Sequence, residues 1–265
     1  LSIVLVLSLA VQIGLVAWRN YPNLDRSQAW AVYDYGLDIL QQPLEPGAAI
    51  VGIQGEITLV RYFQVSCGLR PDLLPVAADL ETERLETVSR LLEEGRAVYL
   101  TRDLPGAAER WSLGALGPLV RVYAQPVSAT RSTSAPAGIQ LSPEIALRSY
   151  SVSRPPSHML PPPVRLTLIW QVQAPLSRSL KFSVRLLDRQ QQPVGQADAV
   201  PVHFTYPTNR WRPGELVSDV YDLTLPPGLA EGEYTPLIIL YDPAEGVTEL
   251  SRTILPPVYL SGATS

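Results

Sequence analysis

The first eighteen positions of the chain are almost entirely apolar. Residues 1–18 read LSIVLVLSLAVQIGLVAW, with no charged residue and only serine and glutamine as polar interruptions. A helix that spans a bilayer needs about 20 such residues. Aromatic and cationic residues of the kind found at the headgroup level follow, and then a helix-stopping proline: Trp18, Arg19, Tyr21 and Pro22. The pattern predicts a transmembrane helix over residues 1–20.

Two other interpretations of this segment compete with a membrane span. The core of a signal peptide is shorter and follows a basic stretch, whereas a buried helix of a soluble domain shows a polar stripe, which residues 1–18 lack. The sole methionine is Met159, so we expect the chain to continue a longer protein. Membrane orientation stays open, because the positive-inside rule compares the loops on both sides of a span.

Residues 23–126 alternate between helical periodicity and short apolar runs, which is typical of α/β layering. We expect Asp25 to cap a helix that ends near Pro43. Further helices are predicted at 57–68 and 81–95, and four strands at 48–53, 72–77, 97–101 and 119–123. The pattern predicts a small α/β domain, Rossmann-like, with a mostly parallel sheet.

Ligands of open α/β sheets bind beyond the carboxyl ends of the strands. The residues expected there are Gln54 to Glu56, Asp79, and Thr101 to Asp103. No GxGxxG fingerprint or GK[ST] motif accompanies them, so nucleotide binding lacks its usual support. Glu56 has an alternative role as a cap of the following helix, whose positive end favours a carboxylate.

The pattern changes twice more along the chain. Residues 127–142 are rich in Ser, Thr, Ala and Pro and predict a flexible linker. Residues 143–260 contain about seven short alternating runs separated by Pro/Gly turns, which predict an antiparallel, immunoglobulin-like β-sandwich. Its expected inward side chains include Trp170, Phe182 and Tyr221, and Pro236 marks an expected edge strand.

Composition excludes several classes of function. The charged fraction is 17% and the net charge is −4, without a Lys/Arg cluster, which argues against nucleic-acid binding. Cys67 is the only cysteine and His158 and His203 the only histidines, so neither a metal site nor a catalytic triad is predicted. No cofactor is expected. No paired carboxylates, nucleophile elbow or phosphate loop indicates an autonomous enzyme.

A resemblance to a known family rests on two motifs in the α/β region. The segment from Asn23 to Pro75 resembles the part that follows the last transmembrane helix in the DUF2723 family of membrane proteins, relatives of protein O-mannosyltransferases. RYFQ (61–64) and GLRPD (68–72) carry it. The β-region is similar to C-terminal sandwich domains of bacterial membrane glycosyltransferases, through LTLIWQVQAPL (166–176), PTNRWRPGE (207–215), DLTLPPGLAEGEY (222–234) and LYDP (240–243).

The resemblance implies the non-catalytic, extracytoplasmic C-terminal part of a membrane glycosyltransferase that acts on lipid-linked sugars. Family members carry an Asn/Asp-rich loop where this chain has residues 54–56. No catalytic residue transfers, because the acidic loops of the family's membrane domain lie upstream. The expected partners are membrane lipid and a glycan or lipid-linked sugar; the oligomeric state stays open.

The candidate ligand-binding residues combine the strand-end loops, the RYFQ motif and one aromatic residue near a sandwich turn. Aromatic side chains on sandwiches often stack on sugars, although packing in the core is the alternative for Trp211, as for Tyr206 and Tyr221. The competing hypothesis for the whole chain is a membrane-anchored structural or protein-interaction module without saccharide specificity. The candidate residues are Gln54, Glu56, Arg61, Tyr62, Asp79 and Trp211.

Overall fold

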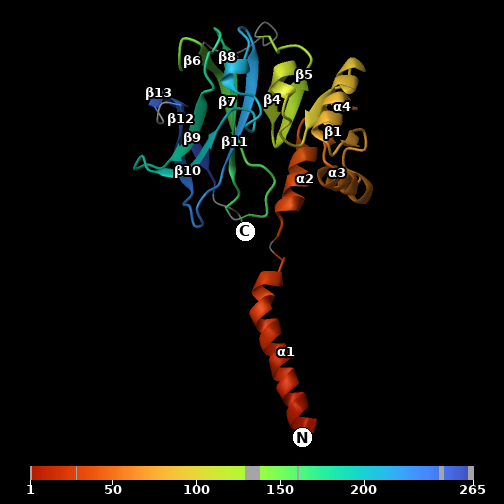
Figure 1. The fold of residues 1–265 in the computed structure, drawn as a ribbon. Coiled ribbons are helices and arrows are strands. Elements are labelled where there is room, and N and C mark those ends of the chain that lie inside the picture. Colours follow the sequence, from red (N-terminus) through yellow and green to blue (C-terminus); the bar gives the residue numbers. More distant parts are fainter. Residues whose placement is uncertain (1, 28, 129–137, 160, 245–247, 262–265) are drawn as a thin grey trace.

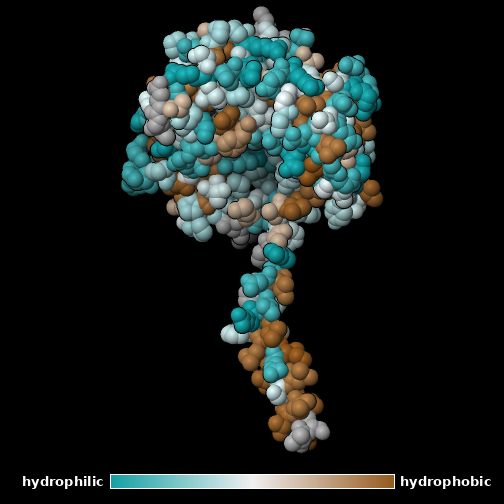
Figure 2. Space-filling view, viewed as in Figure 1, coloured by the Kyte–Doolittle hydropathy of each residue, from teal (hydrophilic) through white to brown (hydrophobic). Residues whose placement is uncertain are grey.

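The computed structural model describes residues 2–27, 29–128, 138–159, 161–244 and 248–261. Helix α1 (Ser2–Leu24) projects away from the rest of the molecule (Figure 1), and apolar side chains cover most of it except near its C-terminal end (Figure 2). Its segment Ile3–Tyr21 is long and apolar enough to cross a membrane, and none of it is buried. The predicted apolar helix is confirmed; a membrane anchor and a signal sequence share these properties.

Helix α2 (Ala31–Gln41) begins later than the sequence predicted. Asp25 does not cap it: the Asp25 Oδ1 atom accepts a hydrogen bond from the Ser27 amide at 2.9 Å, within the connection between the two helices. A short carboxylate side chain competes with helix formation by bonding to the nearby backbone. Residues 25–30 therefore separate the two helices.

The first sheet has five strands in the order β2-β1-β3-β5-β4. Strand β1 pairs in parallel with β2 and β3, whereas β5 pairs antiparallel with β3 and β4, so only half of the sheet is parallel. Four strands match the prediction, and β4 is additional. The strands are β1 (Ala49–Gly52), β2 (Leu74–Ala77), β3 (Val98–Leu100), β4 (Ser112–Leu116) and β5 (Leu119–Tyr123).

Helices cover both faces of this sheet. Ile50 packs in one apolar cluster with Ile39 of α2 and Phe63 of α3 (Gln54–Cys67). Val51 packs in another cluster with Leu91 of α4 (Glu81–Glu93). Because alternate strand residues point to opposite faces, α2 and α3 lie on one side and α4 on the other. The short helix α5 (Ala107–Arg110) leads into β4.

Two antiparallel sheets form the rest of the molecule, in the orders β11-β8-β7-β6 and β10-β9-β12-β13, with β14 also paired to β12. All seven predicted strands are present, and β6 and β14 are additional. The strands are β6 (Ile139–Gln140), β7 (Ile145–Ser153), β8 (Val164–Val172), β9 (Lys181–Leu187), β10 (Pro193–Ala199), β11 (Leu216–Leu223), β12 (Gly232–Asp242), β13 (Thr248–Ile254) and β14 (Val258–Leu260).

Side chains that alternate along β8 and β9 fill the space between the two sheets. Trp170 is completely buried, and its ring stacks on that of Phe182 with 4.3 Å between centroids. Tyr206 and Tyr221 are buried as well. The predicted inward positions are confirmed, and core packing is confirmed for both tyrosines.

The prediction that Pro236 marks an edge strand is wrong. Strand β12 lies inside its sheet, between β9 and β13. Pro236 falls between the β12 residues paired with β14 and those paired with β13. Its carbonyl accepts from the Leu255 amide at 2.9 Å, on the side where the strand changes partner. A proline without an N–H is therefore tolerated there.

The α/β layer and the sandwich share one continuous apolar cluster. The Ser218 hydroxyl of β11 donates to the Ala115 carbonyl of β4 at 2.8 Å. The predicted linker begins and ends in contact with the sandwich: Leu216 donates its amide to the Val127 carbonyl at 2.7 Å, and residues 139–140 form β6. Its central residues 129–137 lie outside the described residues.

Candidate functional site

The predicted residues at the carboxyl end of β1 lie in a helix, not in a loop. Gln54 and Glu56 belong to the first turn of α3. Glu56 Oε2 accepts from the Ile53 amide at 3.4 Å, which confirms the capping role. The Gln54 backbone amide donates to Asp79 Oδ1 at 2.8 Å, so the fold brings the Asp79 side chain next to the Gln54 backbone.

The polar groups around Glu56 are bonded to one another. The Thr101 hydroxyl donates to Glu56 Oε2 at 2.6 Å, and the Tyr35 hydroxyl donates to the Thr101 carbonyl at 2.8 Å. Burial, followed by the charge of Glu56, raises the pKa of Tyr35 above its usual value. A Cβ on Gly52 would lie 2.0 Å from Thr101 Oγ1, so the strand end is tightly packed. The arrangement fastens α3 to the sheet.

The three other candidates do not join this cluster. Arg61 donates to the Pro75 carbonyl at 3.3 Å, and Tyr62 is exposed beside the edge of the Phe63 ring. Trp211 as a surface ligand-binding residue is wrong: its side chain is 4% exposed, and its indole N–H donates to the Tyr206 carbonyl at 3.1 Å. The packing alternative for Trp211 is confirmed.

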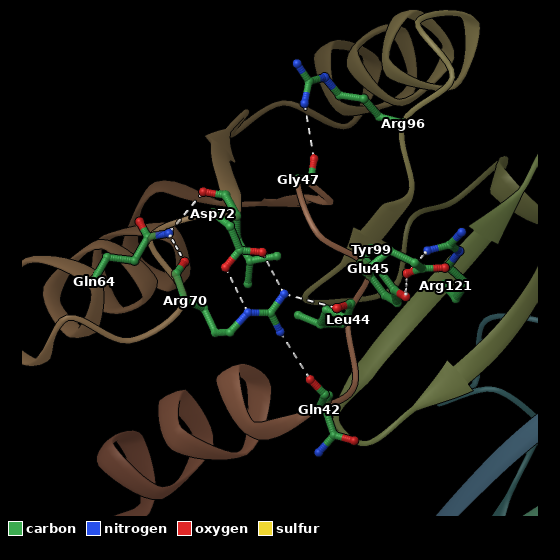
Figure 3. Close-up of polar contacts among 11 residues, drawn as sticks. Gln42, Leu44, Glu45, Gly47, Gln64, Arg70, Asp72, Arg96, Tyr99 and Arg121 are labelled. Atoms are coloured by element: carbon green, nitrogen blue, oxygen red, sulfur yellow. Dashed lines mark hydrogen bonds and ion pairs between the residues drawn. The ribbon is translucent and has the colours of Figure 1, made fainter.

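The two motifs of the family resemblance meet at the opposite end of the sheet (Figure 3). Arg70 has a left-handed backbone, with φ at 45°, and its guanidinium binds both Asp72 oxygens, at 2.9 and 2.8 Å. It also donates to the carbonyls of Gln42 and Leu44, at 3.5 and 3.0 Å. Gln64 of RYFQ donates to the Arg70 carbonyl at 2.9 Å. The motifs thus hold the segment that connects α2 to β1.

An ion pair continues this network across the sheet. Glu45 accepts hydrogen bonds from the Tyr99 hydroxyl and from Arg121 Nη1, the latter at 2.6 Å (Figure 3). Burial acts to raise the pKa of Glu45, but the bonds from Tyr99 and Arg121 outweigh it and hold that pKa below its usual value. The Arg121 guanidinium lies over the Tyr99 ring at 4.6 Å. All these groups serve the fold.

The outer face of the β10-β9-β12-β13 sheet has a different character. Residues directly opposite one another on neighbouring strands point to the same face. One such row contains Gln196, Arg185 and Leu237, and the next contains Asp198, Ser183, Ile239 and Arg252. A bulge between Leu240 and Tyr241 brings Tyr241 opposite Glu249 in a third row.

Together these rows form a cavity of about 350 Å³, which we call the sheet-face cavity. Leu237 and Ile239 make its floor and pack in a small apolar cluster with Leu187, and all three are buried although they point away from the core. The walls are polar, and a volume of this size lies within the usual range of small-ligand sites. The lining residues are Ser183, Arg185, Gln196, Asp198, Leu237, Ile239, Tyr241, Glu249 and Arg252.

The charges of the sheet-face cavity are balanced between two arginines and two carboxylates. Arg252 binds both oxygens of Glu249, at 2.5 and 2.6 Å, which lowers the pKa of Glu249. Burial, followed by the nearby Asp198, raises the pKa of Tyr241. An apolar floor with planar polar groups around it suits a neutral polyhydroxylated ligand, whose hydroxyls both donate and accept.

The sequence indicated only part of this cavity. Alternation along β9 placed Ser183 and Arg185 on the outward face, but nothing in the pattern joins them to residues of three other strands. Among the described residues, no group of three or more His, Cys, Asp or Glu side chains is placed to hold a metal ion.

Comparisons with known proteins assign no family. No family model matches the chain, and no curated protein matches it. The C-terminal domain of Wzt aligns over 53% of this chain and 87% of its own, with 13% identity and a TM-score of 0.36. A Bacteroides fragilis protein described as a β-galactosidase aligns over 60% of this chain, with 11% identity and a TM-score of 0.27. This chain covers only 22% of that protein. Both TM-scores are below those of chains that share a fold, so the chain's family is not assigned.

Proposed function

We propose that this chain is the membrane-anchored, extracytoplasmic part of a glycosyltransferase-like membrane protein, and that it binds a glycan and positions it near the membrane. The sheet-face cavity carries the proposal, because its apolar floor and balanced polar walls match the two kinds of surface that a sugar ring presents. The exposed apolar helix α1 and the motif resemblance support the membrane context.

We also propose finer fold assignments for the two parts. The α/β layer is Rossmann-like, supported by the parallel β2-β1-β3 core with helices on both faces. The two facing antiparallel sheets are immunoglobulin-like. In the α/β layer the polar residues at the strand ends serve packing, so we place the ligand role on the outer face of the sandwich.

Binding by the full chain in lipid nanodiscs tests this function. The probes are an array of neutral and charged oligosaccharides and a short lipid-linked sugar. We expect neutral saccharides to bind, and Asp198→Ala to weaken binding about tenfold or more, because one hydrogen bond with a charged group contributes about 1.5–3 kcal/mol. Tyr241→Ala should weaken binding by a smaller factor, because a hydrogen bond with a neutral hydroxyl contributes about 0.5–1.5 kcal/mol.

The matched control is Glu86→Ala, an exposed carboxylate on α4 outside the cavity, which should bind as the unaltered chain does. Binding that neither cavity substitution weakens would exclude this site. Absence of binding to every saccharide, together with a crosslinked protein partner in intact cells, would support the protein-interaction module instead.

A further inference from the structure

The region where α1 joins the rest of the molecule carries apolar side chains of its own. Trp30 and Val32, at the start of α2, are 40% and 66% exposed. Met159, in the loop between β7 and β8, is 51% exposed. Figure 2 shows apolar atoms where the α1 stalk meets the globular part. We call Trp30, Val32, His158 and Met159 the basal surface.

The basal surface is built by contacts between residues far apart in the sequence. Asp34 of α2 accepts a hydrogen bond from the His158 amide at 2.8 Å, and its other carboxylate oxygen lies 2.5 Å from His158 Nδ1. The Trp30 ring stacks on the imidazole, with 4.3 Å between centroids and 12° between planes. The β7–β8 loop is thereby fixed to the first turn of α2, and Met159 directly follows the fixed His158 in that loop.

We propose that the basal surface docks onto the lipid headgroup layer and so sets the orientation of the globular part on the membrane. The inference rests on the proposed membrane anchorage of α1. Residues 25–30 are the only connection between the two helices, and even fully extended they span at most about 25 Å between Leu24 and Ala31. The basal surface cannot move far from the bilayer in which α1 ends.

The chemistry of the surface favours lipid over a protein partner. Tryptophan is enriched at the membrane–water interface, where its ring lies among headgroups and its N–H finds a polar partner. Exposed Arg19, near the end of α1, and exposed Arg26, within the connection, can contact lipid phosphates.

Fluorescence of a probe on the full chain in lipid nanodiscs tests the docking. Cys67 is the only cysteine and is exposed, so Cys67→Ser gives a background in which Met159→Cys carries a single environment-sensitive label. We expect the label to shift to the blue and to be quenched by nitroxide-headgroup lipids. A label at Glu86→Cys, on α4 at a distance from α1 (Figure 1), should show neither effect.

A second variant separates docking from local folding. Val32→Ser leaves the Asp34–His158 contact unaltered and should reduce quenching of the Met159→Cys label. Equal quenching at Met159→Cys and Glu86→Cys in discs that contain the chain would overturn the docking proposal. Failure of the chain to co-migrate with the discs would instead contradict membrane anchorage, and glycan binding is measured independently of both.

Discussion

Trp170 shows how a single residue contributes to the sandwich. It is completely buried, stacks on Phe182, and donates its indole N–H to Asp219 Oδ2 at 3.3 Å. Trp170→Ala should lower the free energy of unfolding by about 3–5 kcal/mol, because it removes buried apolar surface and leaves a cavity. Urea unfolding of the full chain in detergent measures this change.

Leu250→Ala provides the comparison at the same scale. Leu250 is a partly exposed apolar residue of β13, and its truncation should change stability by no more than about 0.5 kcal/mol. Similar losses for the two variants would contradict the central position of Trp170.

Single residues were predictable where burial follows the strand period. The alternation along β8 placed Trp170 correctly, because every second side chain of a half-buried strand faces the core. Trp211 follows the 3-10 turn Thr208–Arg210, where no such period exists, and only the fold shows that its ring faces Phe182 at 6.3 Å. The sequence could not distinguish an exposed from a buried ring at that turn.

At the scale of elements, Arg70 holds the connection between α2 and β1. Arg70→Ala removes the donors to the Gln42 and Leu44 carbonyls and should destabilise the chain by about 1–2 kcal/mol. Hydrogen exchange should accelerate at the Leu44 and Ala48 amides, which make the turn bonds of this connection.

Arg96→Ala is the matched control for that change. Arg96 reaches the same connection through one bond, to the Gly47 carbonyl at 3.1 Å, and is otherwise paired with Glu94 on the surface. We expect Arg96→Ala to accelerate hydrogen exchange at the Leu44 and Ala48 amides only slightly. If the two substitutions accelerate exchange equally, the special role assigned to the GLRPD motif is wrong.

Helices and strands with a clear periodicity of apolar residues were predicted well. A strand that is buried on both faces lacks that periodicity and was missed. The amphipathic helix α4 and the seven long sandwich strands follow from periodicity. Strand β4 was missed because nearly all of it is buried, so it has no alternation, and because Gly114 interrupts it. Gly114 lets β4 pack closely against β11, because a Cβ on it would lie 3.6 Å from Ser218 of β11.

The sheet-face cavity could not be predicted from the sequence, because it depends on how several strands are aligned. Its residues come from four strands, and the register that aligns them depends on hairpin geometry and on the bulge beside Tyr241. The sequence predicted which side chains of β9 face outward. It did not predict which residues of β10, β12 and β13 lie beside them.

At the scale of the whole molecule, Arg165 joins helix α2 to the sandwich. Its guanidinium binds both Asp38 oxygens of α2, at 2.8 and 2.6 Å, and both Asp222 oxygens of β11, at 2.7 and 2.6 Å. Arg165→Met should destabilise the chain by about 3–5 kcal/mol, because it leaves the buried Asp38 carboxylate unpaired. Urea unfolding in detergent is the measurement.

The double variant Asp38→Asn/Arg165→Met should recover part of this loss, since no buried charge remains without a partner. Arg90→Met breaks the exposed pair with Glu94 on α4 and should cost less than about 1 kcal/mol. An Arg165 effect as small as that of Arg90 would show that the two parts are not held together through this ion pair.

The short connection over residues 25–30 affects how a ligand would reach the sandwich. With α1 anchored in a bilayer as proposed, the sandwich is confined to a thin layer of solution above the lipid. A sugar on a lipid carrier then reaches it by lateral diffusion in two dimensions, at a high effective concentration. Even weak intrinsic affinity would suffice for occupancy, whereas free sugar in bulk solution would compete poorly.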